Sequence, residues 1–144
     1  MISLFGCCPL LKENLMYNSK FDLDLEFGQV YEEGLKKLLY SKGKVEVKTE
    51  RDKWIETGNI AIEVMCRNKP SGLSVTKSDW WFHILSLDKK VKGMICLPVE
   101  ELKNICKYLL KEKKIKMVMG GDDEQSKLLL IPIKLLMGSV GKIF

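Results

Sequence analysis

The spacing of apolar residues changes abruptly near position 43, and this change limits the possible folds more than any other feature. Over residues 26–40 apolar side chains recur at the spacing of a helix. Ser41-Lys42-Gly43 ends that pattern, and residues 44–50 and 60–65 then alternate apolar with polar side chains, which is the period of half-buried strands. Because a polar turn at Thr57-Gly58-Asn59 lies between them, the two strands are predicted to pair as an antiparallel hairpin over residues 44–65.

The rest of the chain predicts further strands and a second helix. The aromatic run of residues 80–85 predicts a central strand. Pro98 stands where a helix can begin, and an apolar face at helical spacing follows it, made by Leu102, Ile105, Cys106, Leu109 and Leu110. After the apolar runs 115–118 and 128–131, Pro132 predicts a segment that is irregular or at a sheet edge. We therefore expect an α/β fold with a central mixed β-sheet flanked by helices.

Length and composition suit one folded domain. The 144 residues are enough for one core of ordinary size, so a single domain is predicted over residues 1–144. Hydrophobic residues make up 46% of the chain and charged residues 30%, which is typical of globular proteins and unlike disordered ones. No apolar run approaches the ~20 residues of a membrane span, so we expect no membrane partner and a cytoplasmic location.

Cysteine usage argues against structural zinc, whereas the net charge decides little. The five cysteines are odd in number and lack metal-finger spacing, and His83 is the only histidine. Cys66, Cys96 and Cys106 lie among apolar neighbours and are expected to be buried, reduced thiols. The net charge of +5 is compatible with a polyanionic partner, but many proteins of this charge bind no nucleic acid.

A row of charged side chains is the strongest candidate for a functional site. In a strand, side chains two positions apart share a face, so Glu46, Lys48 and Glu50 point one way. In the predicted hairpin Glu63 lies close to opposite Glu46, and two facing carboxylates need a compensating cation. We expect both Lys48 and a divalent metal to supply it.

Carboxylates of this kind suit Mg²⁺, which binds few protein oxygens and leaves positions for a phosphate substrate. The metal would neutralise charge on the phosphate, while Lys48 could orient a water or stabilise the developing oxyanion. Glu32, at the edge of the apolar stripe of the first helix, is the candidate for a third acid. The predicted metal ligands are thus Glu32, Glu46 and Glu63.

Four segments carry a family resemblance: residues 27–32, Val45-Glu46-Val47-Lys48-Thr49-Glu50, residues 57–63, and the stretch from Pro70-Ser71-Gly72-Leu73 to Asp79-Trp80-Trp81. Here the chain resembles the PD-(D/E)XK nuclease superfamily, and within it small phage and archaeal-type Holliday junction resolvases. The resemblance implies a restriction-endonuclease-like core, a helix glutamate, an acid on one strand and an acid with lysine on the next. Glu32, Glu46 and Glu63 occur in that order.

The chain departs from the family pattern at two places. No Pro-Asp introduces the first strand, and Met65 stands two residues after Glu63, where the family usually has lysine. Lys48 could supply the amine from the neighbouring strand. Alternatively, Glu46-Val47-Lys48 is itself the acid-x-lysine element, and the preceding acid is Asp22 or Asp24.

The sequence therefore predicts an Mg²⁺-dependent endodeoxyribonuclease, with Mn²⁺ able to substitute, whose catalytic residues are Glu32, Glu46, Lys48 and Glu63. Branched DNA, such as a four-way junction, is the expected substrate, and a homodimer is expected because junction resolvases are symmetric. The resemblance also points toward a virus, whose protein would act in the host cytoplasm. Two alternatives remain: a nicking or restriction-type nuclease on linear duplex, and a non-catalytic DNA-binding module with the same fold.

Several nearby residues have an ordinary structural interpretation beside the functional one. Glu50 is either close to the metal or a partner for Arg51, and His83 is expected to be structural. One of the adjacent residues Trp80 and Trp81 must point inward. A run of lysines could contact DNA phosphates or simply be solvated; it consists of Lys107, Lys111, Lys113, Lys114 and Lys116.

Overall fold

The computed structural model describes residues 36, 43–121 and 123–142. The chain divides into two compact units, residues 1–41 and 42–144, and the description below concerns the second. Of the helix predicted over residues 26–40, only Lys36 is described, and it is helical. Glu32, Asp22 and Asp24 lie outside the described residues, and the single domain over residues 1–144 stays a prediction.

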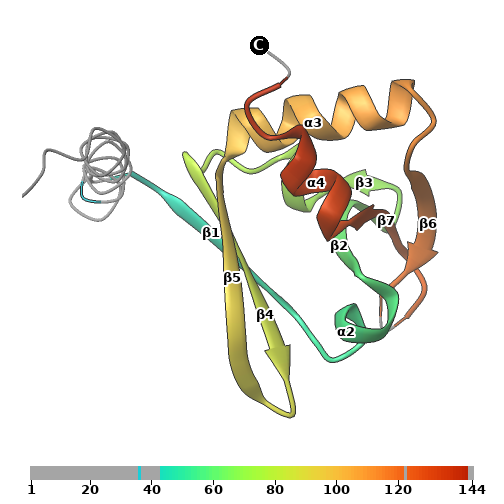
Figure 1. Ribbon diagram of the computed structural model, residues 1–144. Coiled ribbons are helices and arrows are strands. Elements are labelled where there is room, and N and C mark those ends of the chain that lie inside the picture. The colour runs from blue at the N-terminus through green and yellow to red at the C-terminus, as the bar shows by residue number, and fades with distance from the viewer. Residues whose placement is uncertain (1–35, 37–42, 122, 143–144) are drawn as a thin grey trace, which may run out of the picture. The chain divides into compact units, whose positions relative to one another are not determined.

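A three-stranded mixed sheet forms one part of the second unit (Figure 1). Its order is β1 (Val45–Glu50), β4 (Trp80–Leu87) and β5 (Lys90–Pro98). β1 runs parallel to β4, whereas β4 and β5 are antiparallel neighbours in the chain. The predicted aromatic strand is indeed central in this sheet, and the predicted mixed sheet is confirmed.

A second sheet has four antiparallel strands in the order β3, β2, β7, β6 (Figure 1). The four strands are β2 (Asn59–Cys66), β3 (Lys69–Pro70), β6 (Lys116–Gly120) and β7 (Ser126–Pro132). This division of the strands into two sheets was not predicted from the sequence.

The predicted hairpin over residues 44–65 is wrong, because β1 pairs with β4 and β2 pairs with β3 and β7. A short helix, α2 (Trp54–Thr57), separates the two segments. The reason lies in burial: Ile60 and Ile62 of β2 lie beside Leu129 and Ile131 of β7, and all four side chains are fully buried. Pairing with β1, whose Val45 and Val47 are about half exposed, would bury less apolar area.

Two helices pack against the sheets, and the first is as predicted. α3 (Val99–Lys111) begins after Pro98 and buries Leu102, Ile105, Cys106 and Leu109 in the core. The segment after Pro132 is the helix α4 (Ile133–Ser139), so its predicted irregular structure is wrong. Pro132 ends β7 with φ −58° and ψ 126°, and a proline at the start of a helix removes an N–H that would have no helical partner.

One core unites the strands and helices of this unit, with members from Ile60 in β2 to Leu136 in α4. The α/β class is therefore confirmed, while the likeness to a restriction-endonuclease core stays a prediction. The apolar C-terminal segment, residues 131–144, is the expected contact of the predicted homodimer; Ile131 and Leu136 are fully buried in this core, whereas Met137 is half exposed, and the homodimer stays a prediction. No helix within residues 43–121 and 123–142 is long and apolar enough to cross a bilayer.

Candidate functional site

The charged row on β1 faces the core side of its sheet. Glu46, Lys48 and Glu50 lie directly beside Trp81, His83 and Leu85 of β4, which are all buried. Side chains of directly paired residues share a face, so the charges lie on the side where the core is. The charged face is partly buried and the Val45 and Val47 face is exposed, the reverse of an ordinary half-buried strand.

Glu46 and Lys48 form an ion pair on this face, as the shared-face argument predicted. Lys48 Nζ lies 2.8 Å from Glu46 Oε1, and the two side chains are 42% and 29% exposed. The Thr76 hydroxyl donates to the other oxygen, Glu46 Oε2, at 3.3 Å. Lys103 Nζ of α3 donates to the Thr76 carbonyl at 3.4 Å, so the loop that supports Glu46 is itself tied to a helix.

Glu63 lies on the other sheet, with both carboxylate oxygens engaged by hydroxyls. Ser71 Oγ donates to Oε1 at 2.8 Å, and Ser126 Oγ donates to Oε2 at 2.9 Å. Glu63 was predicted to lie close to opposite Glu46, and this is wrong: it lies opposite Leu128 of β7. The segment from Ser71 to Thr76 nevertheless bonds both carboxylates, Glu63 at its start and Glu46 at its end.

The carboxylate of Glu50 ends a hydrogen-bonded chain that begins in the core. Trp81 Nε1 lies 3.3 Å from His83 Nδ1, and His83 Nε2 lies 3.2 Å from Glu50 Oε2. The N–H of Ala61 in β2 donates to the same oxygen at 2.7 Å, so Glu50 links the two sheets. Glu50 also lines a cavity of about 540 Å³ together with Asp52 and Lys53.

These residues offer hard oxygen donors, the kind that Mg²⁺ prefers. Within the part of the chain that the structure describes, no group of three or more acids, histidines or cysteines is arranged to hold a metal. An ionised carboxylate has about four lone-pair sites, so the hydroxyls on Glu46 and Glu63 leave sites for a cation. Glu32, the third predicted metal ligand, lies outside the described residues.

Thr76, Lys77 and Asp79 precede the aromatic strand, where the sequence allows either residues that line a cleft or an ordinary polar strand entry. In the structure they line a small cavity of about 290 Å³ together with Lys103. Trp81 is buried, so the inward position expected for one tryptophan of the pair is confirmed.

Cys66, Cys96 and Cys106 are free thiols, as expected, although only Cys106 is fully buried. Burial raises the pKa of the Cys106 thiol to about 12 and also raises the pKa of Cys96. Because the thiolate is the reactive form, Cys106 is not a nucleophile at neutral pH.

Sequence reasoning missed Ser126 and the link from Trp81 through His83 to Glu50. Ser126 is 63 positions from Glu63, and no local pattern signals that its hydroxyl meets a carboxylate. The His83 link had a weak signal, since Trp81, His83 and Leu85 share one face of a strand. The sequence does not show that β1, which carries Glu50, lies beside β4.

No family model, no curated protein and no solved structure matches this chain.

Proposed function

We propose that the protein is a metal-dependent endodeoxyribonuclease that hydrolyses phosphodiester bonds, preferably in branched DNA. The observation that carries this proposal is the Glu46–Lys48 ion pair on the core side of β1, beside a loop that also bonds Glu63. Charged side chains on the core side of a sheet need pairing and hydrogen bonds, which Glu46 and Lys48 have, and partly buried charge clusters of this kind are common at functional sites.

In this proposal Glu46 and Glu63 hold the metal, and Glu32 completes the set. Bound Mg²⁺, or Mn²⁺ in its place, would neutralise charge on the phosphate. Lys48 would donate to the attacking water or to a non-bridging phosphate oxygen, and Glu46 keeps its ammonium in position. The oxygen of water bonds to phosphorus and the water gives up one proton, one bridging P–O bond breaks, and the leaving oxygen takes up a proton, which yields a phosphate monoester and a free hydroxyl.

A specific observation favours the second candidate, a DNA-binding module without catalysis. Both oxygens of Glu63 accept serine hydroxyls, an arrangement that also serves to fasten β2 to β7 and to the loop at Ser71. On that interpretation Glu63 is structural, and the row on β1 binds no metal.

The test incubates the protein with a labelled four-way junction, a linear duplex of the same sequence and a single strand, each with Mg²⁺, Mn²⁺ or a chelator. Glu46→Gln and Lys48→Gln should each reduce cutting by roughly 100-fold or more, because each removes a group that acts on the reacting phosphate. Asp123→Asn, which breaks the exposed ion pair of Asp123 with Arg67, is the matched control and should cut normally.

The substrates and Glu63→Gln separate the alternatives. Cutting of the junction alone supports a resolvase, and equal cutting of linear duplex supports a nicking or restriction-type nuclease. Glu63→Gln can keep both contacts, because its amide oxygen accepts from one serine and its NH2 donates to the hydroxyl oxygen of the other, so loss of cutting in a folded variant assigns Glu63 to metal binding rather than to structure. No cutting of any DNA overturns the proposal in favour of the binding module.

A further inference from the structure

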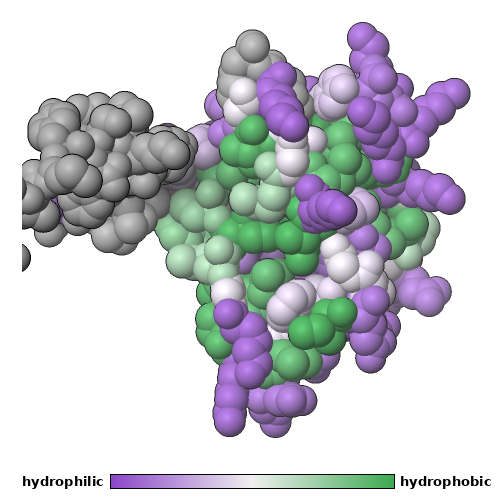
Figure 2. All heavy atoms as spheres, viewed as in Figure 1, coloured by the Kyte–Doolittle hydropathy of each residue, from purple (hydrophilic) through white to green (hydrophobic). Residues whose placement is uncertain are grey.

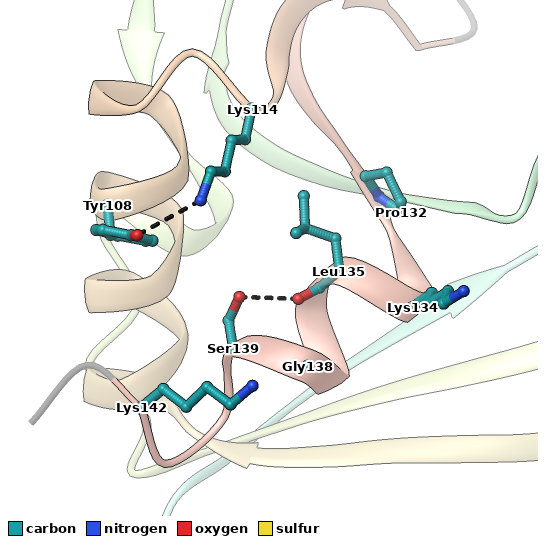
Figure 3. Close-up of a pocket in the computed structure, with 8 residues that line it drawn as sticks. All are labelled: Tyr108, Lys114, Pro132, Lys134, Leu135, Gly138, Ser139 and Lys142. Carbon is teal, nitrogen blue, oxygen red and sulfur yellow. Dashed lines mark hydrogen bonds between the residues drawn. The ribbon is translucent and has the colours of Figure 1, made fainter.

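A basic cavity lies between α3 and α4, away from the charged row on β1 (Figure 3). It measures about 840 Å³ and is lined by Tyr108, Lys114, Pro132, Lys134, Leu135, Gly138, Ser139 and Lys142. Three of these residues are lysines and, among the described residues that line it, none carries a carboxylate. Figure 2 shows hydrophilic side chains gathered around the carboxyl end of α3, next to this region. The cavity thus has an excess of positive charge.

The ammonium of Lys114 is held in place by Tyr108. Lys114 Nζ lies 5.2 Å from the centre of the Tyr108 ring and 3.5 Å from its Oη, an arrangement visible in Figure 3. Since Tyr108 Oη accepts from the lysine, its own hydroxyl proton stays available to a ligand. Ser139 is different, because its Oγ already donates to the Leu135 carbonyl at 2.8 Å. The donors that the cavity offers are therefore the lysines and the Tyr108 hydroxyl.

The lysines are spread along the cavity rather than gathered at one point. Lys114 follows α3, Lys134 is in the first turn of α4, and Lys142 follows α4, with Lys134 pointing away from the other two in Figure 3. All three are exposed. The carboxylate of Glu101, on α3, is engaged by the N–H of Gly141 at 2.8 Å. Separate, exposed ammonium groups suit several successive phosphates better than one enclosed phosphate.

We propose that this cavity binds the phosphodiester backbone of DNA, with Lys114 and Lys142 on phosphates and the apolar surface of Pro132 and Leu135 against a sugar. The choice of DNA as the polyanion rests on the proposed function. The cavity is separate from the Glu46 site, since Lys103, which supports that site, lies on a different side of α3 from Tyr108.

Gly138 provides a sharp test, because a Cβ placed there would meet nothing within 4 Å. Gly138→Glu and Gly138→Gln add side chains of equal size to this open space, and both residues favour a helix more than glycine does. They differ only in charge. Binding of fluorescein-labelled duplex and four-way junction is measured by anisotropy between 50 and 200 mM salt with a chelator present, so that cutting cannot interfere.

We expect Gly138→Glu to weaken DNA binding several-fold relative to Gly138→Gln. The double variant Lys114→Gln with Lys142→Gln should make the fall of log affinity with log salt less steep, by about 0.9 for each phosphate left without its lysine. Near 0.1 M salt this corresponds to a loss of affinity of roughly tenfold per phosphate. The control pair Lys90→Gln with Lys92→Gln removes the same charge from exposed positions on β5 and should change binding less.

The results separate this proposal from the nuclease proposal. Three results would each overturn the cavity proposal. They are equal binding by the two Gly138 variants, equal losses of affinity in the cavity and control pairs, and no DNA binding by the unmodified protein. Cavity-dependent binding without any cutting in Mg²⁺ supports the cavity and overturns the nuclease. Perturbation of cavity residues by a nucleoside monophosphate, with DNA binding unaffected by Gly138→Glu, assigns the cavity to a small ligand and overturns the proposal for DNA.

Discussion

At the scale of single residues, the neighbours of His83 leave one position for its ring proton. The indole N–H of Trp81 can only donate, so His83 Nδ1 must accept and carries no proton. Nε2 then carries the hydrogen and donates to Glu50 Oε2, 3.2 Å away. Since the ring is only 1% exposed, water cannot replace either partner. The Glu50 carboxylate is in this way held at a fixed place at the end of the charged row.

We therefore predict that His83 is a neutral Nε2–H tautomer in the folded protein. His83 is the only histidine in the chain, so a two-bond ¹H–¹⁵N correlation spectrum contains a single imidazole and needs no assignment. The expected spectrum has a ¹⁵N shift of the unprotonated type at Nδ1 and of the protonated type at Nε2. A proton on Nδ1 would contradict the prediction, because the Trp81 N–H would then have no acceptor on the ring.

At the scale of elements, the turn η1 (Gly72–Ser74) depends on close approach to β2. Gly72 has φ +50°, and a Cβ on it would collide with the Glu63 carbonyl oxygen. The residue before it, Ser71, bonds both the Val64 carbonyl and the Glu63 carboxylate. Only glycine permits this approach, and the approach is what places the Ser71 hydroxyl on Glu63.

We predict that Gly72→Ala lowers the free energy of unfolding by about 1–3 kcal/mol or more, since it adds both backbone strain and a steric clash. Urea denaturation followed by circular dichroism measures the decrease. Gly93→Ala is the control: Gly93 has ordinary φ and open space around its Cβ, so the change should be small or slightly stabilising. Equal stability of the two variants would show that the loop shifts freely and does not position Ser71.

The same scale shows what the sequence could predict of the fold. Element types follow from local patterns, and β4, α3 and the alternation in β1 and β2 are found where predicted. The pairing of strands does not follow from local patterns, because it depends on which apolar side chains bury one another, and these can be far apart in the sequence. β2 alternates as a hairpin strand would, yet Ile60 and Ile62 find their partners in Leu129 and Ile131, about half the chain away. The helix α4 does not follow from the local pattern either, because a proline after a strand is compatible with a sheet edge, an irregular segment or the start of a helix.

At the scale of the whole molecule, the candidate site was predictable in content but not in arrangement. The period of 2 in β1 correctly places Glu46 and Lys48 on one face, and their ion pair confirms it. The position of Glu63 relative to them depended on the wrong hairpin, so its true contacts with Ser71 and Ser126 could not be foreseen. The relation of Glu32 to these residues stays a prediction.

The second compact unit should fold without the first, because the described part of its core, from Ile60 to Leu136, already joins both sheets to α3 and α4. We predict that a fragment of residues 42–144 unfolds in one cooperative transition in urea, with a stability close to that of the whole chain. The measurement compares both proteins by near-UV circular dichroism and denaturation. A fragment without cooperative unfolding would contradict this prediction and show that the core needs residues 1–41.

The same fragment tests the third metal ligand, because it lacks Glu32 but keeps Glu46, Lys48 and Glu63. If three acids are needed for the metal, the folded fragment should cut DNA at least roughly 100-fold more slowly than the whole chain. Glu32→Gln in the whole chain is the matched variant, because it removes the carboxylate charge and leaves the rest of the first unit unchanged. It should lose as much activity as the fragment if that carboxylate binds the metal. A fragment that cuts as fast as the whole chain would exclude Glu32 and leave a site made by β1, β2 and the loop between Ser71 and Thr76 alone. Loss of cutting in the fragment but not in Glu32→Gln would mean that the first unit contributes something other than this carboxylate, such as binding to DNA.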